Sequence, residues 1–298
     1  MKHLFIVILI VSYFSSSAQN IKTYTYAIKG LDTLKMDVYT PDNIKETDSL
    51  PVVVWMHGGG FSGGSRKGKD ETNIANFATS KNYIGISISY RLLRKGAKTG
   101  FGCKCAKKNK LFTFNQGVLD FLDATQFIHE NSDMLQVDTT KIIAAGSSAG
   151  AEIILHTVFM KRFFLSTETA YENINYAAAI SFSGAILNSD DITTDNAIPT
   201  VLFHGTEDTT VPFNTAPHHN CQPNKTGFMM LDGSHTIAEK LKELETPYYF
   251  NIVKGGHHDV ANVHINDLDD IFYFLDKTVK KNEVIQMTEY TSPKPTNY

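Results

Sequence analysis

Short apolar runs alternate along the chain with segments in which apolar residues recur at helical spacing. Continuous apolar runs, typical of strands buried on both faces of a sheet, occupy residues 51–56, 84–90, 142–145, 180–182, 199–203 and 248–253. Helical spacing predicts helices over residues 115–131, 149–164, 235–245 and 268–280. Residues 23–29 and 34–39 flank a turn at Gly30 and predict an antiparallel hairpin. This order predicts an α/β fold, with a mostly parallel central sheet, helices on both faces and an opening antiparallel hairpin.

Composition narrows the class of protein. The chain has 298 residues, of which 42% are hydrophobic and 20% charged, so it has ample material for a buried core and is not disordered. A net charge of −3 provides no positive field for nucleic acid. No repeat and no Pro/Ser-rich linker divides the chain. We therefore expect one domain over residues 19–282, followed by a frayed tail over 283–298.

The first residues have the features of a secretory signal peptide. A basic start at Lys2 precedes an apolar run over residues 4–14, and small residues at Ser16 and Ala18 suit a signal peptidase. The run is too short to cross a bilayer about 30 Å thick as a helix. We therefore expect residues 1–18 to be removed by cleavage near Ala18, giving a secreted or periplasmic protein without a membrane anchor.

Two segments match the pattern G-x-S-x-G, which presents a nucleophilic serine on a sharp turn between a strand and a helix. One spans residues 146–150 and contains Ser148, and the other spans residues 60–64 and contains Ser62. Both follow a strand-like run, but only the first is followed by a convincing helix. The sequence therefore favours Ser148 as the nucleophile.

Three consecutive glycines follow the apolar run that ends at Met56. Without Cβ atoms, their backbone N–H groups can converge on one point, as a developing oxyanion requires. With Ser148 as the nucleophile, the predicted oxyanion-hole donors are the N–H groups of Gly59, Gly60 and Ala149. A phosphate-binding loop is disfavoured because no Gly-Lys-Ser/Thr closes the run.

These segments together resemble a known family. The His-Gly-Gly-Gly-Phe motif at 57–61, the Ser-Tyr-Arg-Leu stretch at 89–92 and the Gly-Ser-Ser-Ala-Gly motif at 146–150 are similar to those of α/β-hydrolase-fold serine carboxylesterases. Within this fold the resemblance is to the hormone-sensitive-lipase and acetyl-xylan-esterase type. It extends over about residues 23–280 and implies the chain order Ser, then Asp or Glu, then His.

The resemblance also implies the acid and the base. The segment 204–212 resembles the family's H-G-x-x-D-x-x-V-P pattern, which assigns the acid to Asp208, with Glu207 as the nearby alternative. The Gly255–His258 spacing matches G-x-x-H and favours His258 as the base, with His257 as the alternative. We expect His57 and His204 to hold loops, and His218 and His219 to be exposed. The histidines show no metal-site spacing, so we predict no metal and no cofactor.

One segment departs from the family pattern. Residues 91–110 contain eight basic residues and no acidic one. This segment is predicted to be either a solvated loop or a positively charged rim that attracts an anionic polymer. It also contains Cys103 and Cys105, and Cys221 lies in the loop after Asp208. A disulfide from Cys103 or Cys105 to Cys221 is one prediction, and a Cys103–Cys105 bridge is the other; either leaves one thiol.

The predicted function is a secreted serine esterase that hydrolyses carboxylic esters with short-chain or carbohydrate-linked acyl groups through an acyl-enzyme. The expected partner is a small-molecule or polysaccharide-linked ester, with no nucleic acid and no membrane after signal cleavage. The sequence predicts no particular oligomeric state. Two alternatives remain: a serine peptidase or amidase on the same fold, and a non-catalytic binding protein. The binding protein is disfavoured because candidates for all three catalytic side chains are present.

Overall fold

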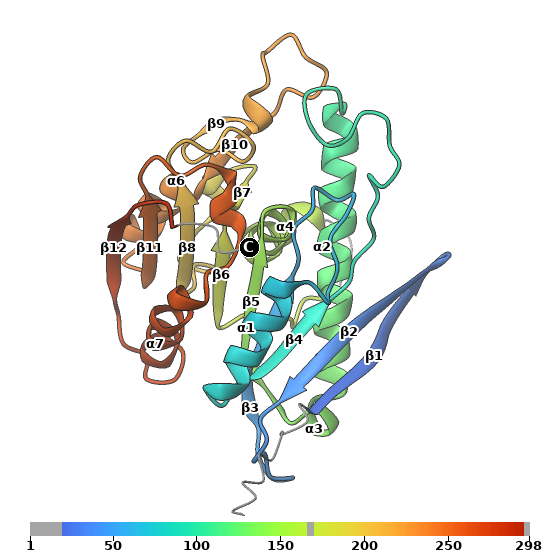
Figure 1. Cartoon of the computed structure of the whole chain (residues 1–298), viewed down its shortest axis with the longest axis vertical. Coiled ribbons are helices and arrows are strands. Elements are labelled where there is room, and N and C mark those ends of the chain that lie inside the picture. The colour runs from blue at the N-terminus through green and yellow to red at the C-terminus, as the bar shows by residue number, and fades with distance from the viewer. Residues whose placement is uncertain (1–19, 166–169, 295–298) are drawn as a thin grey trace, which may run out of the picture.

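The structure is a computed structural model that describes residues 20–165 and 170–294 (Figure 1). The predicted signal peptide, residues 1–18, lies outside the described residues. The main sheet has nine strands in the order β1-β2-β4-β3-β5-β6-β8-β11-β12. Their bounds are β1 Asn20–Lys29, β2 Asp32–Thr40, β3 Leu50–Met56, β4 Ile84–Ile88, β5 Val137–Ser147, β6 Ala178–Phe182, β8 Thr200–Gly205, β11 Tyr248–Val253 and β12 Gln286–Thr291. Among the described strands of this sheet, only the β1–β2 and β2–β4 pairings are antiparallel, which confirms the mostly parallel sheet and its opening hairpin.

Seven α-helices and a second, small sheet complete the described chain. The helices are α1 Lys69–Ser80, α2 Lys107–Glu130, α3 Ser132–Leu135, α4 Ala149–Phe159, α5 Lys161–Phe164, α6 Ser234–Glu243 and α7 Leu268–Thr278. The small sheet has the order β7-β10-β9, formed by β7 Ala185–Ile186, β9 Ala216–Pro217 and β10 Met230–Gly233. Four short 3₁₀ helices are η1 Ser189–Asp191, η2 His218–Asn220, η3 His258–Ala261 and η4 Ile265–Asp267.

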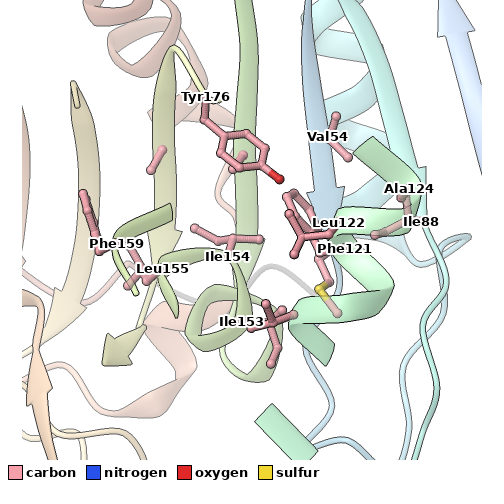
Figure 2. Close-up of a cluster of buried hydrophobic side chains, with 14 of the residues drawn as sticks. Val54, Ile88, Phe121, Leu122, Ala124, Ile153, Ile154, Leu155, Phe159 and Tyr176 are labelled. Carbon is pink, nitrogen blue, oxygen red and sulfur yellow. The ribbon is translucent and has the colours of Figure 1, made fainter. Parts of the chain in front are cut away.

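Helices cover both faces of the sheet, because each buried strand sends alternate side chains to opposite faces. In β3, Val53 and Trp55 belong to the core cluster that includes residues of α1 and α7, whereas Val52 and Val54 belong to the cluster on the other face, with residues of α2, α4 and α6. Figure 2 shows part of the second layer, where Phe121 and other residues of α2 meet residues of α4 beneath β3. Buried hydrophobic side chains therefore cover both faces of the sheet.

The carboxyl ends of β3, β5, β6, β8 and β11 lie side by side, because these five strands are parallel neighbours. In register, Trp55 of β3 pairs with Ala145 of β5, and Phe250 of β11 pairs with Leu202 of β8. The segments that leave β3, β5, β8 and β11 carry the glycine loop, the serine turn, Asp208 and His258. In open α/β sheets this edge is where ligands bind.

The predicted frayed tail from residue 283 is wrong for Gln286–Thr291. These residues form β12, which pairs in parallel with the whole of β11. The segment is polar and exposed because it is an edge strand, so its sequence shows no apolar run. The sheet therefore continues beyond residue 282, the boundary predicted for the domain.

Two helices differ from the predicted ones. α2 begins at Lys107, eight residues before the predicted start at 115, and the predicted helix 149–164 is broken at Met160 into α4 and α5. Helix α1 was not predicted, because it is polar except for one narrow face that includes Ile74 and Ala78. Among the described residues, no helix combines the length and the apolar character needed to cross a membrane.

Candidate active site

The segment after β5 forms a sharp turn with Ser148 at its tip. Ser148 has φ 48° and ψ −122°, a region that side-chain-bearing residues rarely occupy. A Cβ at Gly146 would lie 2.7 Å from the carbonyl carbon of Gly150, and a Cβ at Gly150 would lie 2.1 Å from the carbonyl oxygen of Met56. Both glycines are therefore required by close backbone contacts, and α4 begins immediately after the serine.

The second match to the serine pattern has a different setting. Ser62 is exposed, and its hydroxyl donates to the carbonyl oxygen of Gly59 at 3.2 Å. No histidine ring contacts Ser62 in the part of the chain that the structure describes. The segment is a turn in which Gly64, at φ 91°, packs against the ring of His57. The geometry thus favours Ser148 over Ser62.

Ser148 stands at one end of a chain of two short contacts. Its Oγ lies 2.8 Å from His258 Nε2, and His258 Nδ1 lies 2.7 Å from Asp208 Oδ2. A carboxylate only accepts hydrogen bonds, so Nδ1 carries the proton and Nε2 is free to accept from the serine hydroxyl. His257 points elsewhere: it is largely exposed, and its Nδ1 lies 3.0 Å from the carbonyl oxygen of Glu207. Of the two histidines, His258 alone contacts Ser148.

Asp208 is held in a fixed orientation. Its Oδ1 accepts hydrogen bonds from the backbone N–H groups of Thr210 at 2.8 Å and Val211 at 3.0 Å, and its side chain is fully buried. Burial alone would raise its pKa, but hydrogen bonds from His204 and His258 outweigh this effect and lower the pKa below its ordinary value. Asp208 is therefore a carboxylate at any neutral or mildly acidic pH. Glu207, the alternative acid, is exposed and lies beside His257.

The glycine loop after β3 lies against the serine turn. A Cβ at Gly58 would be 3.2 Å from Ser148 Cβ, and Gly59 and Gly60 have φ values of 113° and 58°. Within the described residues, the N–H groups of Gly59, Gly60 and Ala149 donate to no other group. The Ala149 N–H also belongs to the N-terminus of α4, where the helix dipole favours negative charge. The three predicted donors thus have no hydrogen-bond partner among the described residues, and the glycine loop reaches Ser148 at Gly58.

The remaining histidines follow the predictions in part. His204 holds a loop as expected, because its Nδ1 contacts Ser234 Oγ at 2.8 Å and its Nε2 contacts the carbonyl oxygen of Val211 at 3.2 Å. The prediction that His218 is exposed is wrong: it is 1% exposed, and its Nδ1 lies 3.1 Å from Lys110 Nζ. His219 is half-buried rather than exposed. Among the described residues, no group of three or more His, Cys, Asp or Glu side chains could hold a metal.

The basic segment, residues 91–110, is partly exposed and partly buried, so neither of the two predictions holds for the whole segment. Arg91 Nε lies 2.8 Å from the buried carboxylate of Asp120, and Lys110 is completely buried at the start of α2. The other lysines of the segment are exposed, and none forms an ion pair with a described residue: Lys95, Lys98, Lys104, Lys107 and Lys108. Part of the segment is therefore an exposed basic surface, and part is anchored into the core.

A disulfide joins this segment to the loop after Asp208. The structure bonds Cys103 to Cys221, which are 118 positions apart, and leaves Cys105 as a buried thiol. Two backbone hydrogen bonds reinforce the link, from the Gly227 N–H to the Cys103 carbonyl and from the Lys107 N–H to the Thr226 carbonyl. We call residues 101–107 and 218–229 together the strap. The strap holds the loop of His218 against the start of α2.

Loss of this disulfide should destabilise the protein. We expect Cys221→Ser to lower the free energy of unfolding by about 2–4 kcal/mol, because the bond closes a long loop in the unfolded chain. Urea unfolding of the oxidised wild type and the variant measures the difference. Cys105→Ser is the matched control and should lose much less. A native free-thiol count of three in the wild type would contradict the disulfide.

One polar residue at this edge was missed by the sequence analysis. Glu152 lies one helical turn after Ser148 in α4 and is 2% exposed. It is the only acidic residue of this mostly apolar helix, and that isolation in the sequence could have identified it. Its carboxyl oxygen Oε1 lies 3.2 Å from His218 Nε2.

Comparison with solved structures identifies the fold. The chain is similar to esterase 2 of Thermogutta terrifontis, with a TM-score of 0.65 at 20% sequence identity, over 86% of this chain and 94% of that one. The unliganded form of the same esterase aligns with a TM-score of 0.63 at 19% identity, over 92% and 97% of the two chains. At this identity the likeness shows the fold alone. The predicted α/β-hydrolase fold is confirmed.

Sequence comparison identifies the family. A medium-chain fatty acyl-CoA hydrolase precursor of Anas platyrhynchos is 33% identical over 138 residues, which are 46% of this chain and 23% of that protein. A secreted triacylglycerol lipase of Gibberella zeae is 28% identical over 169 residues, 56% of this chain and 27% of that protein. These alignments cover about a quarter of each relative's length. The carboxylesterase family model, in contrast, matches residues 12–275, so the chain belongs to the carboxylesterase family.

Proposed function

We propose that the protein is a serine esterase that hydrolyses carboxylic esters, with Ser148 as nucleophile, His258 as general base and Asp208 as the residue that orients the histidine. The observation that carries this proposal is the chain of two contacts, 2.8 Å and 2.7 Å long, that links the three side chains. Membership of the carboxylesterase family supports it. Within the α/β-hydrolase fold, the glycine loop favours the hormone-sensitive-lipase and acetyl-xylan-esterase type.

The reaction proceeds in two steps. Ser148 Oγ attacks the ester carbonyl carbon while its proton passes to His258 Nε2. The carbonyl oxygen becomes an oxyanion that accepts hydrogen bonds from the N–H groups of Gly59, Gly60 and Ala149, each worth about 3 kcal/mol. His258 then gives the proton to the leaving alkoxy oxygen as the carbon–oxygen bond breaks. In the second step a water molecule, deprotonated by His258, attacks the acyl-enzyme and releases the acid and Ser148.

We propose a short-chain or carbohydrate-linked acyl group as the substrate. Structures of the Thermogutta terrifontis esterase include butyrate-bound and propionate-bound forms, which supports a short acyl chain. Residues 1–18 favour secretion, and one relative is named a secreted lipase. The catalytic domain would then begin at residue 19 and extend through β12.

A panel of substrates tests this function. We expect nitrophenyl acetate and butyrate to be hydrolysed at least about tenfold faster than nitrophenyl palmitate. A palmitoyl group has an extended apolar tail that the site must bury, whereas an acetyl or butyryl group has none. Acetylated xylan should release acetate. Hydrolysis of nitroanilides at rates similar to those of the esters would favour the amidase alternative, and no turnover of any member would favour a binding protein.

The exposed lysines of the basic segment add a second comparison within the same panel. They form a positively charged surface that would attract an anionic polysaccharide ester. Activity on an acetylated acidic polysaccharide should fall as NaCl rises from 0.05 to about 0.5 M, since salt screens exposed charges. Activity on the neutral acetylated xylan should change little. Equal salt dependence for both substrates would remove any role of this surface in selecting the substrate.

A further inference from the structure

Three buried polar side chains from three separate elements meet beside the proposed active site. Lys110 comes from the first turn of α2, His218 from the strap and Glu152 from the first turn of α4. Lys110 Nζ lies 3.1 Å from His218 Nδ1, and His218 Nε2 lies 3.2 Å from Glu152 Oε1. None of the three residues is more than 2% exposed. We call this group the buried relay.

The chemistry of the three groups fixes the direction of the relay. An ammonium group only donates hydrogen bonds, so His218 Nδ1 accepts from Lys110 and its proton is on Nε2. That N–H faces Glu152 Oε1, although the two atoms are not aligned well enough for a hydrogen bond in this structure. Burial and the charge of Lys110 lower the pKa of His218, so the imidazole is neutral. The relay therefore has a cation at one end and a carboxyl group at the other.

Glu152 is also close to the proposed catalytic groups. Its backbone N–H donates to the Ser148 carbonyl at 2.9 Å, and residues four apart on a helix share one face. The charged and titratable groups that act on Glu152 come from several elements: Lys110 of α2, His218 and His219 of the strap, Tyr90 after β4, Asp208 after β8 and His258 of η3. A charge on Glu152 is therefore felt by His258.

Stability gives no reason for such an arrangement. Removing the Lys110 ammonium and the Glu152 carboxyl group, ionised or not, from water costs free energy, and apolar side chains of the same volume would pack here at lower cost. Glu152 Oε1 and His218 Nε2 have no hydrogen-bond partner among the described residues. The relay is thus better explained by an effect on its neighbours than by its own contribution to folding.

We propose that Glu152 is a positioning residue for the reaction, whose carboxylate, held by His218 and Lys110, stabilises the imidazolium of His258. This inference rests on the proposed function, because the imidazolium forms only when His258 takes the proton of Ser148. Asp208 contacts the imidazole directly, and Glu152 adds a second negative charge from the α4 side. Because Glu152 is removed from solvent, its charge is screened less than that of a surface group.

The relay predicts a specific dependence of activity on pH. Burial raises the pKa of Glu152 to about 8, although His219, His258 and Lys110 act in the opposite direction. A histidine general base gives one rise of activity with pH in any such enzyme, and a second rise should follow near pH 8 as Glu152 ionises. We expect the wild-type kcat for nitrophenyl acetate, corrected for spontaneous hydrolysis, to show both rises between pH 5 and 9.5. A single rise would contradict the proposal without any variant.

Glu152→Gln keeps the shape of the side chain and removes its charge. We expect kcat to fall about tenfold at pH 9, where Glu152 is ionised in the wild type, and less than about twofold at pH 6, where it is protonated. The second rise should disappear, and Glu152→Asp should restore part of it. The exposed Glu243→Gln is the matched control and should behave as the wild type.

The melting temperatures of the wild type and Glu152→Gln at two pH values distinguish the proposed role from a merely structural one. The pKa of Glu152 is about 4.3 in the unfolded chain, and burial raises it to about 8 in the folded protein. Between these values the folded state binds the extra proton, so the wild type loses stability as pH rises. Glu152→Gln should therefore melt at a higher temperature than the wild type at pH 9, with a smaller difference at pH 4. A structural role predicts a lower melting temperature at both.

Two further measurements separate the possible failures. Lys110→Met removes the cation that favours ionised Glu152, so the second rise should move above pH 8; an unchanged position would contradict the relay even if the Gln variant does not fold. Titration with a serine-reactive organophosphate counts competent sites in each variant. If Ser148→Ala is inactive but Glu152→Gln equals the wild type at pH 9, only this inference fails. If Ser148→Ala remains active, the proposed function itself fails.

Discussion

Ser148→Ala is expected to lower kcat for nitrophenyl acetate by about 10⁶-fold, since a nucleophile and its base act as one unit. The variant keeps Cβ and the backbone conformation but lacks the Oγ that lies 2.8 Å from His258 Nε2. Steady-state hydrolysis, with circular dichroism as the test of folding, measures the effect. The residual rate reflects the oxyanion donors and substrate binding, which the substitution leaves intact.

Ser62→Ala is the matched control, because Ser62 occupies the second G-x-S-x-G match and its hydroxyl bonds only to a loop carbonyl. It should keep activity within about twofold. Wild-type turnover in Ser148→Ala, together with loss in Ser62→Ala, would reverse the assignment of the nucleophile.

Ser148→Gly distinguishes strain from simple loss of the hydroxyl. The serine has φ 48°, which a side chain makes costly and glycine does not. We expect this variant to be as inactive as the alanine variant and about 1 kcal/mol more stable in urea unfolding. Such a gain would show that the turn stores strain in order to expose the hydroxyl. Equal stability of the two variants would show that the turn is not strained.

The site was predictable largely because each motif directly follows a buried parallel strand. The apolar runs ending at Met56 and Phe203 correspond to β3 and β8, and their carboxyl ends must lie on one edge of the sheet. The choice between His257 and His258 followed only from the resemblance to a family. In the structure it depends on the path of the backbone after Gly255, which has φ 72° and turns His258 toward Ser148.

Features that depend on contacts between distant segments were not predicted. Lys110 lies in a run of lysines that is typical of a solvated loop. In the structure, however, it is buried, and its Nζ contacts His218, which lies 108 positions later in the chain. β12 is polar, and only its backbone pairing with β11 makes it a strand. Local periodicity contains no information on either contact, because both partners lie far away in the sequence. The buried relay is a product of such contacts.

Asp208→Asn is expected to lower kcat by about 10⁴-fold, and the structure gives the reason. Oδ1 of Asp208 accepts hydrogen bonds from the backbone N–H groups of Thr210 and Val211. An asparagine would therefore place its carbonyl oxygen at the position of Oδ1. Its NH₂ group would then face His258 Nδ1 and donate to it. The imidazole would adopt the tautomer with the proton on Nε2, which cannot accept the proton of Ser148.

Because the pKa of Asp208 is held below its ordinary value, the wild-type residue is a carboxylate throughout an assay from pH 6 to 9, and the deficit should persist over that whole range. Glu207→Gln, the adjacent exposed acid, is the matched control and should retain nearly full activity. The nitrogen chemical shifts of the His258 ring should show the change of tautomer directly. A large loss in Glu207→Gln with little loss in Asp208→Asn would move the orienting role to Glu207, and would make the 2.7 Å contact between Asp208 and His258 irrelevant to catalysis.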